Sequence, residues 1–311
     1  MKGWLSDFEL RDGKILVRET GAELSLDFAL VREVMGWFPF YLLVRFSTFL
    51  AGLKPRPKPR VGFVPGPARP WYLLPFLTQA ARYRRTKLPE KADILIYFED
   101  KTLATPPHIP ADFTGKMINF ACTDISKTRV AEVFADIFGY GLAVDPCTYT
   151  GLMAVKSEKN GAHDGMIVQG PVKPEEVDAS LVYQRLIDNR LSEGDDKVID
   201  LRCPTVNGKI GLIFIKHRPL HSRFANFNAR VELARPEDYL SAEERTKLAA
   251  FARAMRLDFG GLDVLRDRSD GRIYVVDVNK TDMGPPIALP LADKFRATRI
   301  LTKQLKDFFG G

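Results

Sequence analysis

Short apolar runs separated by polar turns mark the first half of the chain after an apolar N-terminal stretch. Such runs occur at residues 61–64, 94–98 and 117–120, and each is bounded by Pro, Gly or charged residues. This pattern predicts buried strands of an α/β layer. Apolar residues at helical spacing over 127–138, followed by Gly139, predict a helix that ends at a glycine.

The second half of the chain is rich in hairpin signals. Asn207-Gly208 separates two strand-like runs, and a turn at 269–271 separates residues 262–266 from 272–278. Ser241 and Glu244 have the spacing of a capping box and predict a helix that continues to residue 255. Strands that follow one another without a helix between them indicate an antiparallel sheet, distinct from the N-terminal layer.

Residues 34–53 form a long apolar stretch, interrupted by Pro39 and Arg45. A membrane span needs about 20 apolar residues, and a central arginine opposes insertion, so we do not expect a transmembrane helix. Two alternatives remain, a helix that lies in a membrane interface and a helix packed on the body of the protein or on a partner subunit. The basic, Pro-rich run 54–60 predicts an extended linker.

Composition narrows the class of protein. The chain has 311 residues, 45% of them hydrophobic, with a net charge of +7, as expected of a globular protein with room for two domains. Three cysteines without ligand spacing favour neither disulfides nor zinc. Without a signal peptide, we expect a cytoplasmic protein in a reducing compartment.

The positive charge is concentrated near the N-terminus. Residues 1–100 hold 16 basic and 11 acidic side chains, a net of +5. No nucleic-acid recognition motif accompanies this charge, so we expect no nucleic-acid partner. An anionic membrane surface is the alternative partner, and it would place the protein on the inner face of a membrane. A solvated basic face is the simplest explanation of the charge.

Three oxygen-bearing side chains predict a metal site. Asp277 and Asn279 are two apart on a predicted strand and therefore share a face. A three-residue turn at 269–271 would place Asp263 directly opposite Asp277, where two carboxylates repel unless a cation or a proton is shared. Such an all-oxygen set suits Mg²⁺. A two-residue turn at Asp270-Gly271 would instead put the aspartates on opposite faces.

The three-residue turn has further consequences for the pairing of these strands. It places Leu265 opposite Val275 and Arg268 opposite Arg272. Two arginines directly opposite each other count against this register, although both would lie at the exposed turn end.

The Asn207-Gly208 hairpin predicts a second polar pair. In that register Asp200 and Arg202 share a face, opposite Ile215 and Ile213. An arginine on an otherwise apolar sheet face needs an anionic partner. That partner is either a protein carboxylate or a phosphate group of a ligand.

The stretch from Gly261 to Asn279 resembles the C-terminal metal-binding signature of the ATP-grasp superfamily, an acidic residue on one strand and an acidic-x-Asn motif on its neighbour. The resemblance extends over residues 148–306 and, more weakly, over 61–147. It implies an α+β ATP-grasp fold of antiparallel sheets with helices, preceded by a reduced α/β N-terminal domain. The implied parts are an amphipathic segment with a linker (1–60), the α/β domain (61–147) and the ATP-grasp domain (148–311).

The resemblance also assigns the phosphate-binding and catalytic groups. Lys156, before a loop of small residues, matches the family's strand lysine, and Arg202 in Asp-Leu-Arg matches the arginine that faces the transferred phosphate. Lys127 is a candidate for a further phosphate-binding lysine. Without the acidic cluster, Lys156 would be taken for an exposed lysine at a strand end. Asp277 stands where the family usually has Glu.

The adenosine site is implied by the same resemblance. Residues 182–188 look like the family's linker, in which Gln184 and Ile187 border the adenine and Asp188 accepts from the ribose hydroxyls. By itself, this segment reads as an ordinary buried strand.

These assignments imply an ATP- and Mg²⁺-dependent ligase that activates a carboxylate as an acyl phosphate for attack by an amine or a similar nucleophile. One alternative is a kinase that phosphorylates a hydroxyl group, for example of a membrane lipid. Another is a non-catalytic nucleotide-binding or membrane-associated accessory protein. The substrate is expected to be a small molecule or a lipid, and the sequence does not indicate an oligomeric state.

Overall fold

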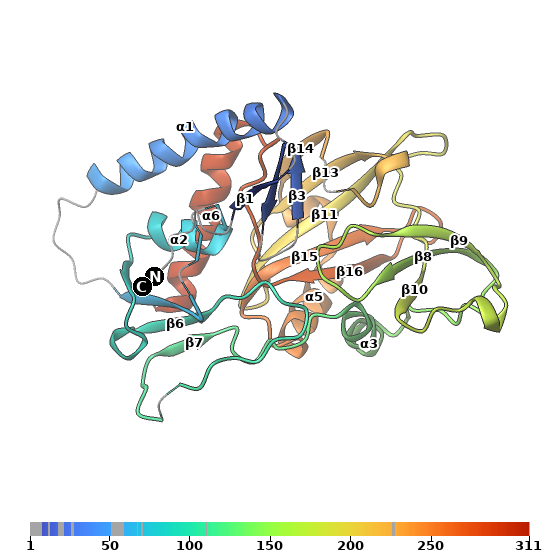
Figure 1. Cartoon of the computed structure of the whole chain (residues 1–311), viewed down its shortest axis with the longest axis horizontal. Helices are drawn as coiled ribbons and strands as arrows, with labels where there is room; N and C mark the ends of the chain where they lie inside the picture. Colours follow the sequence, from blue (N-terminus) through green and yellow to red (C-terminus); the bar gives the residue numbers. More distant parts are fainter. Residues whose placement is uncertain are drawn as a thin grey trace.

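The protein has an α+β fold, in agreement with the sequence-based prediction (Figure 1). The computed structural model describes residues 8–11, 13–17, 22–25, 28–50, 59–66, 68–69, 71–109, 111–225 and 228–310. Four sheets and the helices around them make up this part of the chain.

A parallel sheet forms the N-terminal layer. Its strand order is β5-β4-β6-β7, and every neighbouring pair is parallel. The three apolar runs predicted as strands correspond to β4, β6 and β7, which confirms the α/β layer. The elements of this layer are β4 (Arg60–Val64), α2 (Leu73–Ala80), β5 (Arg84–Thr86), a short 3₁₀ helix (Pro89–Lys91), β6 (Ile94–Tyr97) and β7 (Lys116–Ile118).

An antiparallel sheet of order β14-β13-β11-β15-β16 forms the centre of the molecule, with β12 paired to β11. Helices α3 and α5 contact each other, and both pack against its apolar face. The strands are β11 (Lys197–Val206), β12 (Lys209–Ile210), β13 (Ile213–Pro219), β14 (Arg230–Ala234), β15 (Phe259–Arg266) and β16 (Ile273–Asn279). The helices are α3 (Lys127–Phe138), α4 (Pro236–Tyr239) and α5 (Ala242–Ala254).

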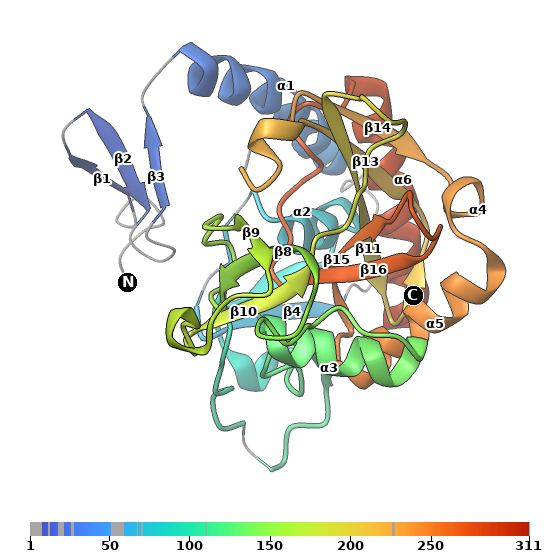
Figure 2. The same ribbon diagram turned by 90° about the vertical axis from the view of Figure 1, so that its right-hand side faces the viewer.

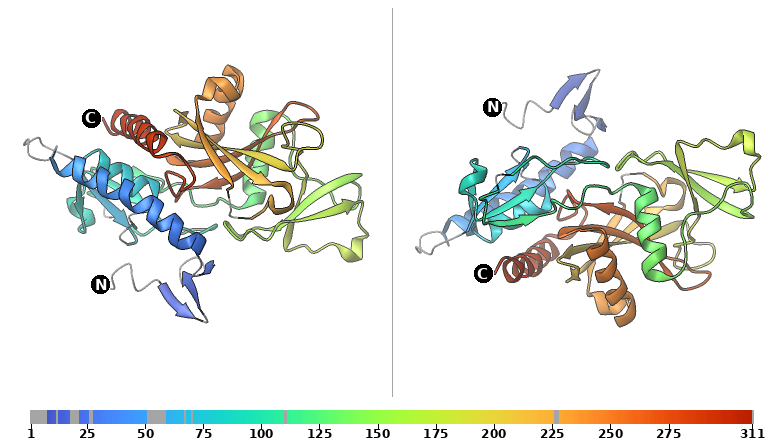
Figure 3. Two further views of the ribbon diagram at one scale, coloured as in Figure 1. Left: turned by 90° about the horizontal axis from the view of Figure 1, so that it is seen from above. Right: turned by 90° about the horizontal axis from the view of Figure 1, so that it is seen from below.

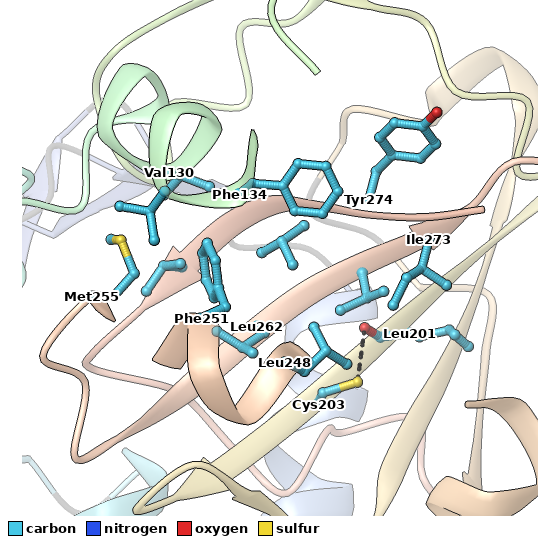
Figure 4. Close-up of a cluster of buried hydrophobic side chains, with 14 of the residues drawn as sticks. Val130, Phe134, Leu201, Cys203, Leu248, Phe251, Met255, Leu262, Ile273 and Tyr274 are labelled. Carbon is cyan, nitrogen blue, oxygen red and sulfur yellow. Dashed lines mark hydrogen bonds between the residues drawn. The ribbon is translucent and has the colours of Figure 1, made fainter. Parts of the chain in front are cut away.

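The main hydrophobic core lies between these two helices and the sheet. Figure 4 shows Phe134 of α3 and Phe251 of α5 in one cluster with Leu262 of β15 and Tyr274 of β16. The local signals for both helices are confirmed, because Gly139 adopts a left-handed conformation with a φ of 79° and Ser241 closes a capping box with Glu244. The core fixes which face of the central sheet is left for polar side chains.

A third sheet stands beside the central one. Its order is β10-β8-β9, all antiparallel, and the views in Figure 1 and Figure 2 place it next to β15 and β16. Its strands are β8 (Gly151–Ser157), β9 (Met166–Gly170) and β10 (Leu181–Arg185); one 3₁₀ helix, Pro174–Glu176, lies between β9 and β10, and another, Leu220–Ser222, follows β13. A small antiparallel sheet of β1 (Phe8–Arg11), β2 (Lys14–Val17) and β3 (Ala22–Ser25), not predicted from the sequence, precedes the first helix.

The first helix, α1 (Phe28–Leu50), continues through Pro39 and packs on the body of the protein by one side. The ring of Phe40 lies 5.2 Å from that of Phe76 in α2 and 5.2 Å from that of Phe295 in α6 (Leu291–Phe309). Within the described ranges, no helix is long and apolar enough to cross a membrane. Most of the predicted linker, residues 54–58, lies outside the described residues.

The predicted pairing of β11 with β13 is wrong by one residue. Asp200 lies opposite Lys216 and Arg202 opposite Phe214, rather than opposite the predicted isoleucines, Ile215 and Ile213. Next to the turn, Thr205 pairs with Ile210 in the predicted register, and the irregular segment between β12 and β13 then adds one residue. The shift places Lys216 on the same face as Asp200, so this face is not apolar.

The pairing of β15 with β16 combines a correct and an incorrect prediction. Asp263 lies opposite Asp277, as predicted, but Leu265 lies opposite Tyr274 rather than Val275. The turn is longer than predicted, because Asp267 rather than Arg268 pairs with Arg272, through a hydrogen bond of 2.9 Å from the Asp267 amide to the Arg272 carbonyl.

A β-bulge on β16 brings Asp277 back opposite Asp263, although the longer turn by itself would shift the pairing by one residue. The pairing shifts between Asp263 and Val264, which leaves Val276 as the extra residue on β16. The two departures, a longer turn and a bulge, therefore cancel at Asp263 and Asp277.

Candidate functional site

A cleft lies where the β8–β9–β10 sheet meets β15 and β16. Side chains from both sheets and from α3 line it, and six of the residues predicted from the sequence are among them: Lys127, Lys156, Gln184, Ile187, Asp263 and Asp277. The small-residue loop between β8 and β9, residues 161–165, forms part of the wall. The structure thus brings residues that are up to 150 positions apart into one site.

Asp263 is held by two cations from neighbouring strands. Its Oδ2 lies 2.6 Å from Nη1 of Arg202, and its Oδ1 lies 3.5 Å from Nζ of Lys216. Although burial by itself would raise the pKa of this carboxyl, the charges of Arg202 and Lys216 lower it to about 2. Asp263 is therefore ionised and already partly neutralised by the protein.

Asp277 has a different environment. Its Oδ1 accepts a hydrogen bond of 3.0 Å from the amide of Val278, and no lysine or arginine of the described chain lies within ion-pair distance of it. Burial, and then the negative charge of Asp263, raise the pKa of Asp277. A carboxylate that faces another carboxylate without its own cation is a position at which a bound cation is stabilised.

Two lysines approach the same region from the opposite wall. Nζ of Lys156 lies 3.4 Å from the carbonyl oxygen of Val276, and Nζ of Lys127, at the first turn of α3, donates a 2.8 Å hydrogen bond to the carbonyl of Lys159. Burial lowers the pKa of Lys156 to about 8, and the charge of Asp277 counteracts part of this effect. These two ammonium groups supply positive charge next to the acidic pair.

A buried amide faces the apolar end of the cleft. Gln184 is 1% exposed, and its Nε2 has no hydrogen-bond partner within the part of the chain that the structure describes. Ile187, 2% exposed, lies nearby in the cleft wall. An unsatisfied buried amide is costly unless a ligand completes its hydrogen bonds, and a flat heteroaromatic ring next to an aliphatic side chain would do so.

Two predicted ligand groups are engaged elsewhere. The carboxylate of Asp188 accepts from Nε of Arg190 at 2.7 Å and from Nε of Arg268 at 3.2 Å; the hydrogen bonds from Arg190 lower its pKa to about 2. Oδ1 of Asn279 accepts from the amide of Thr281 at 2.9 Å. Neither residue is part of the cleft wall, and their roles as ribose and metal ligands stay predictions.

Arg202 is buried and bridges two carboxylates. Besides Asp263, it contacts Asp282, whose Oδ1 lies 3.1 Å from Nη2. Burial by itself would lower the pKa of Arg202, but the two carboxylates raise it. The other carboxylate oxygen of Asp282 has no hydrogen-bond partner among the described residues. Arg202 therefore lies behind Asp263, and its contact with a phosphate stays a prediction.

The sequence shows a dense polar segment that includes Lys216, Arg218 and Arg223 and is either a substrate loop or an ordinary surface loop, but it does not give the partners of these side chains at the cleft. Arg218 forms a 2.6 Å ion pair with Asp200, and Nη2 of Arg223 donates to the carbonyl of Ile187 at 2.6 Å. The alternation of Lys216 and Arg218 on β13 is the signal that could have placed both beside Asp200, once the register shift is known. No local signal ties Asp282 to Arg202, because 80 residues separate them.

The carboxylates of the cleft suit Mg²⁺, which binds few protein ligands, better than a metal ion coordinated by protein side chains alone. No group of three His, Cys, Asp or Glu side chains suited to a metal ion occurs within the described residues. Mg²⁺ commonly takes only one or two carboxylates and completes its shell with phosphate oxygens and water. Asp263 and Asp277, with lysines across the cleft, meet that requirement when a polyphosphate is present.

Comparisons with known proteins give structural matches only. No family model and no curated protein matches the chain. The ATP-grasp ligase PsnB, in a complex with a precursor variant, Mg and ADP, matches with 12% identity and a TM-score of 0.48, over 79% of this chain and 100% of its own. D-alanine–D-alanine ligase from Bacillus anthracis, in a complex with ATP, matches with 14% identity and a TM-score of 0.45, over 81% and 96%.

A RimK domain ATP-grasp protein from Sphaerobacter thermophilus matches with 13% identity and a TM-score of 0.48, over 81% of this chain and 100% of its own. ATP-grasp proteins are thus among the solved structures that this chain resembles, as its motifs predict.

Proposed function

We propose that this protein is an ATP- and Mg²⁺-dependent ligase of the ATP-grasp type. It would activate a carboxylate as an acyl phosphate, which an amine or a similar nucleophile then attacks. One observation supports the proposal above all: Asp263 is neutralised by Arg202 and Lys216, whereas Asp277, directly opposite, has no cation of its own among the described residues. The pair is arranged for a cation that arrives with a ligand.

The cleft has the complementary groups for the nucleotide. Lys127 and Lys156 offer ammonium groups to phosphates, and the loop of small residues after Lys156 allows backbone N–H groups to approach them. At the other end, the free Nε2 of Gln184 can donate to a ring nitrogen of the base, while Ile187 packs on its face. We propose these four residues as the ATP contacts.

Bound Mg²⁺ would neutralise phosphate charge and hold the phosphates in line for transfer. Asp263 and Asp277 would hold the ion, and the ion pairs of Arg202 and Lys216 keep Asp263 ionised and fixed in orientation. The lysines stabilise the charge that develops on the phosphate oxygens, and fixed charges of this kind act mainly by positioning and electrostatics.

The reaction follows from these contacts. A carboxylate oxygen of the substrate attacks the γ-phosphorus and ADP leaves; the nucleophile then attacks the acyl carbon, and inorganic phosphate leaves. In this scheme Arg202 orients Asp263 and does not contact the phosphate. It would contact the phosphate only if its ion pair with Asp282 were broken.

Calorimetric titration with Mg–AMPPNP tests nucleotide binding. Lys156→Ala should weaken binding at least tenfold, because one cationic contact in a partly desolvated cleft is lost. Lys247→Ala, at a partly exposed position of α5 where the lysine pairs with Glu243, is the matched control and should bind as wild type does. Equal affinity of wild type and Lys156→Ala would show that Lys156 does not contact phosphate.

Product analysis separates the reaction classes. A ligase yields ADP, phosphate and an amide or ester, a kinase yields ADP and a stable phosphoester, and a non-catalytic protein binds the nucleotide without turnover. Incubation with ATP, Mg²⁺ and hydroxylamine in the presence of candidate carboxylates would trap an acyl phosphate as a hydroxamate. A phosphoester, or no turnover across a broad set of carboxylates, would overturn the ligase proposal.

A further inference from the structure

The loop between β8 and β9, residues 158–165, is fastened to the N-terminal layer. The amide of Asn160 donates a 2.8 Å hydrogen bond to the hydroxyl oxygen of Thr102, and its side-chain amide donates to Oδ1 of Asp100 at 3.4 Å. Both views of Figure 3 show the β8–β9 loop, in yellow-green, meeting a blue-green segment of the N-terminal layer near the middle of the molecule. Because residues 161–165 line the cleft, these contacts help to set the position of its wall.

A second set of contacts ties the same loop to the start of α3. The amide of Thr128 donates a 3.2 Å hydrogen bond to Oε2 of Glu158, and the hydroxyl of Thr128 donates to the other carboxylate oxygen. Lys127 donates to the carbonyl of Lys159, as described above. The first three residues of the loop are therefore all held by side chains or amides from outside the β8–β9–β10 sheet.

Asp100 also contacts the end of the strand that carries Asp277. It lies in the segment after β6, and the side chain of Thr281 forms a hydrogen bond with its carboxylate. The hydroxyl of Thr281 also lies 3.2 Å from Oδ1 of Asn279, the last residue of β16. One carboxylate of the N-terminal layer thus contacts both the β8–β9 loop and the segment that ends β16.

The contacts of Asp100 lie in a region with little access to water. Thr281 is 2% exposed, and burial raises the pKa of Asp100. The hydrogen bonds from Thr281 and Asn160, and then the charge of the fully buried Lys280, counteract this effect. Without Asp100, a buried hydroxyl and the side-chain amide of Asn160 would lose a hydrogen-bond partner that water replaces poorly in such surroundings. The bridge through Asp100 therefore opposes movement of the loop relative to the end of β16.

We propose that Asp100 is a positioning residue that keeps the β8–β9 loop and the end of β16 at the separation required by Mg²⁺ and nucleotide together. This inference rests on the proposed function. Mg²⁺ demands nearly ideal octahedral geometry, with ligands at about 2.0–2.1 Å. An ion that joins phosphates beside the loop to carboxylates on the strands therefore tolerates little change in this separation, whereas the nucleotide without Mg²⁺ contacts the loop independently of β16.

The dependence of nucleotide affinity on Mg²⁺ tests the proposal. The dissociation constant of AMPPNP is measured by calorimetry with excess Mg²⁺ and again with EDTA, and the ratio of the two affinities is compared between variants. Chelation of Mg²⁺ by the free nucleotide is the same for every variant, so a change in this ratio reports on the protein. Asp100→Ala should lower the ratio by about fivefold or more, the lower end of ordinary coupling between sites.

Rescue by the conservative variant separates positioning from a general loss of structure. Asp100→Asn should keep the ratio close to that of wild type, because its carbonyl oxygen still accepts from Asn160 and its amide can donate to the hydroxyl of Thr281. Asp93→Ala is the matched control. It removes a carboxylate at the other end of β6, where Asp93 binds Arg60, and should leave the ratio unchanged.

Two further variants each remove one side of the bridge. Asn160→Ala and Thr281→Val should both lower the ratio, and they test the same coupling if Asp100→Ala does not fold. Asp100→Ala should cost less in the Asn160→Ala background than in wild type, because residues that act through one contact are not additive.

Three results would overturn the inference. The first is an unchanged ratio in folded Asp100→Ala, and the second is a ratio in Asp100→Asn as low as in Asp100→Ala; both leave the nucleotide site of wild type intact. The third is failure of the wild-type protein to bind AMPPNP with or without Mg²⁺, which would overturn the proposed function as well.

Discussion

Replacing Asp277 with Asn should have opposite effects on the stability of the free protein and on its response to ligand. In the folded protein, burial and the facing carboxylate of Asp263 raise the pKa of Asp277. A carboxyl whose folded pKa lies above its unfolded value destabilises the fold at pH values above that range, where it must ionise in an unfavourable site. Removing the charge should therefore stabilise the protein at pH 7.

The size of this effect follows from the strand geometry. Side chains directly opposite each other on antiparallel strands have Cβ atoms about 5 Å apart. Two unit charges at that separation repel by about 3 kcal/mol at an effective dielectric constant near 20. Because Arg202 and Lys216 offset part of the charge on Asp263, we expect Asp277→Asn to gain about 1–2 kcal/mol, a rise in Tm of roughly 2–5 °C.

The pH dependence gives an internal check. The gain should be complete near pH 7 and should shrink as the pH falls toward the unfolded-state pKa of about 4, because the wild-type carboxyl is then protonated as well. Thermal unfolding monitored by circular dichroism over this pH range measures it.

Ligand should reverse the order of the two proteins. At 100 times its dissociation constant, Mg–AMPPNP should stabilise wild type by about 2.7 kcal/mol and Asp277→Asn far less. Asp238→Asn, at an exposed carboxylate paired with Arg235, is the control and should respond as wild type does. The cation-site assignment fails if Asp277→Asn destabilises the free protein, or if it keeps the full Mg–nucleotide response.

Three further predictions follow. Because burial lowers the pKa of Lys156 to about 8 and a bound phosphate would raise it again, affinity for Mg-free ADP should be constant below pH 7 and fall above pH 8; a flat calorimetric profile to pH 9.5 would contradict this. A Cβ added at Gly261 would lie 2.5 Å from Oδ2 of Asp282, so Gly261→Ala should cost about 1–3 kcal/mol in urea unfolding and weaken Mg–nucleotide binding, and wild-type values for both would refute the crowding. Phe40→Ala should cost about 3–5 kcal/mol and Phe46→Ala less than about 0.5, since only Phe40 is buried; similar losses would show that both sides of α1 are covered.

Signals contained within a few residues predicted the local structure well. The glycine after α3 and the capping box of α5 act within one helical turn, and both occur where the sequence placed them. Short apolar runs likewise identified β4, β6 and β7, and the signal is clearest for β6, which is buried along its whole length.

Strand register could not be predicted from the same signals. It depends on turn length and on bulges, and a bulge places one extra residue without a distinctive side chain to mark it. Val276 and the segment between β12 and β13 are such cases. The facing aspartates were predicted correctly although the turn was not, whereas Asp200 and Arg202 share a face as predicted but lie opposite Lys216 and Phe214 instead of the two isoleucines.

Non-local pairings were beyond a reading of single motifs. Asp282 meets Arg202, and Arg268 meets Asp188, through the folded arrangement of distant segments. The position of α1 is a similar case. Its composition fits both a helix packed on the protein or a partner subunit and a helix in a membrane interface, because each places the apolar side chains in apolar surroundings. In the structure, Phe40 packs against the body of the protein, whereas side chains on the opposite side of α1, such as Phe46, are exposed.

The bulge at Val276 makes the acidic pair depend on the number of residues in a strand as well as on their identity. If the same residues continued the pairing set by the turn without a bulge, Asp277 would lie opposite Leu262 and would face the hydrophobic core. Most substitutions in β16 leave this arrangement intact, and a deletion of Val276 would keep Asp277 opposite Asp263 in a regular strand, whereas a one-residue insertion before Asp277 would separate the two carboxylates unless the bulge grew to absorb it. Among related sequences, insertions between the turn and Asp277 are therefore expected to be rarer than exchanges of side chains there.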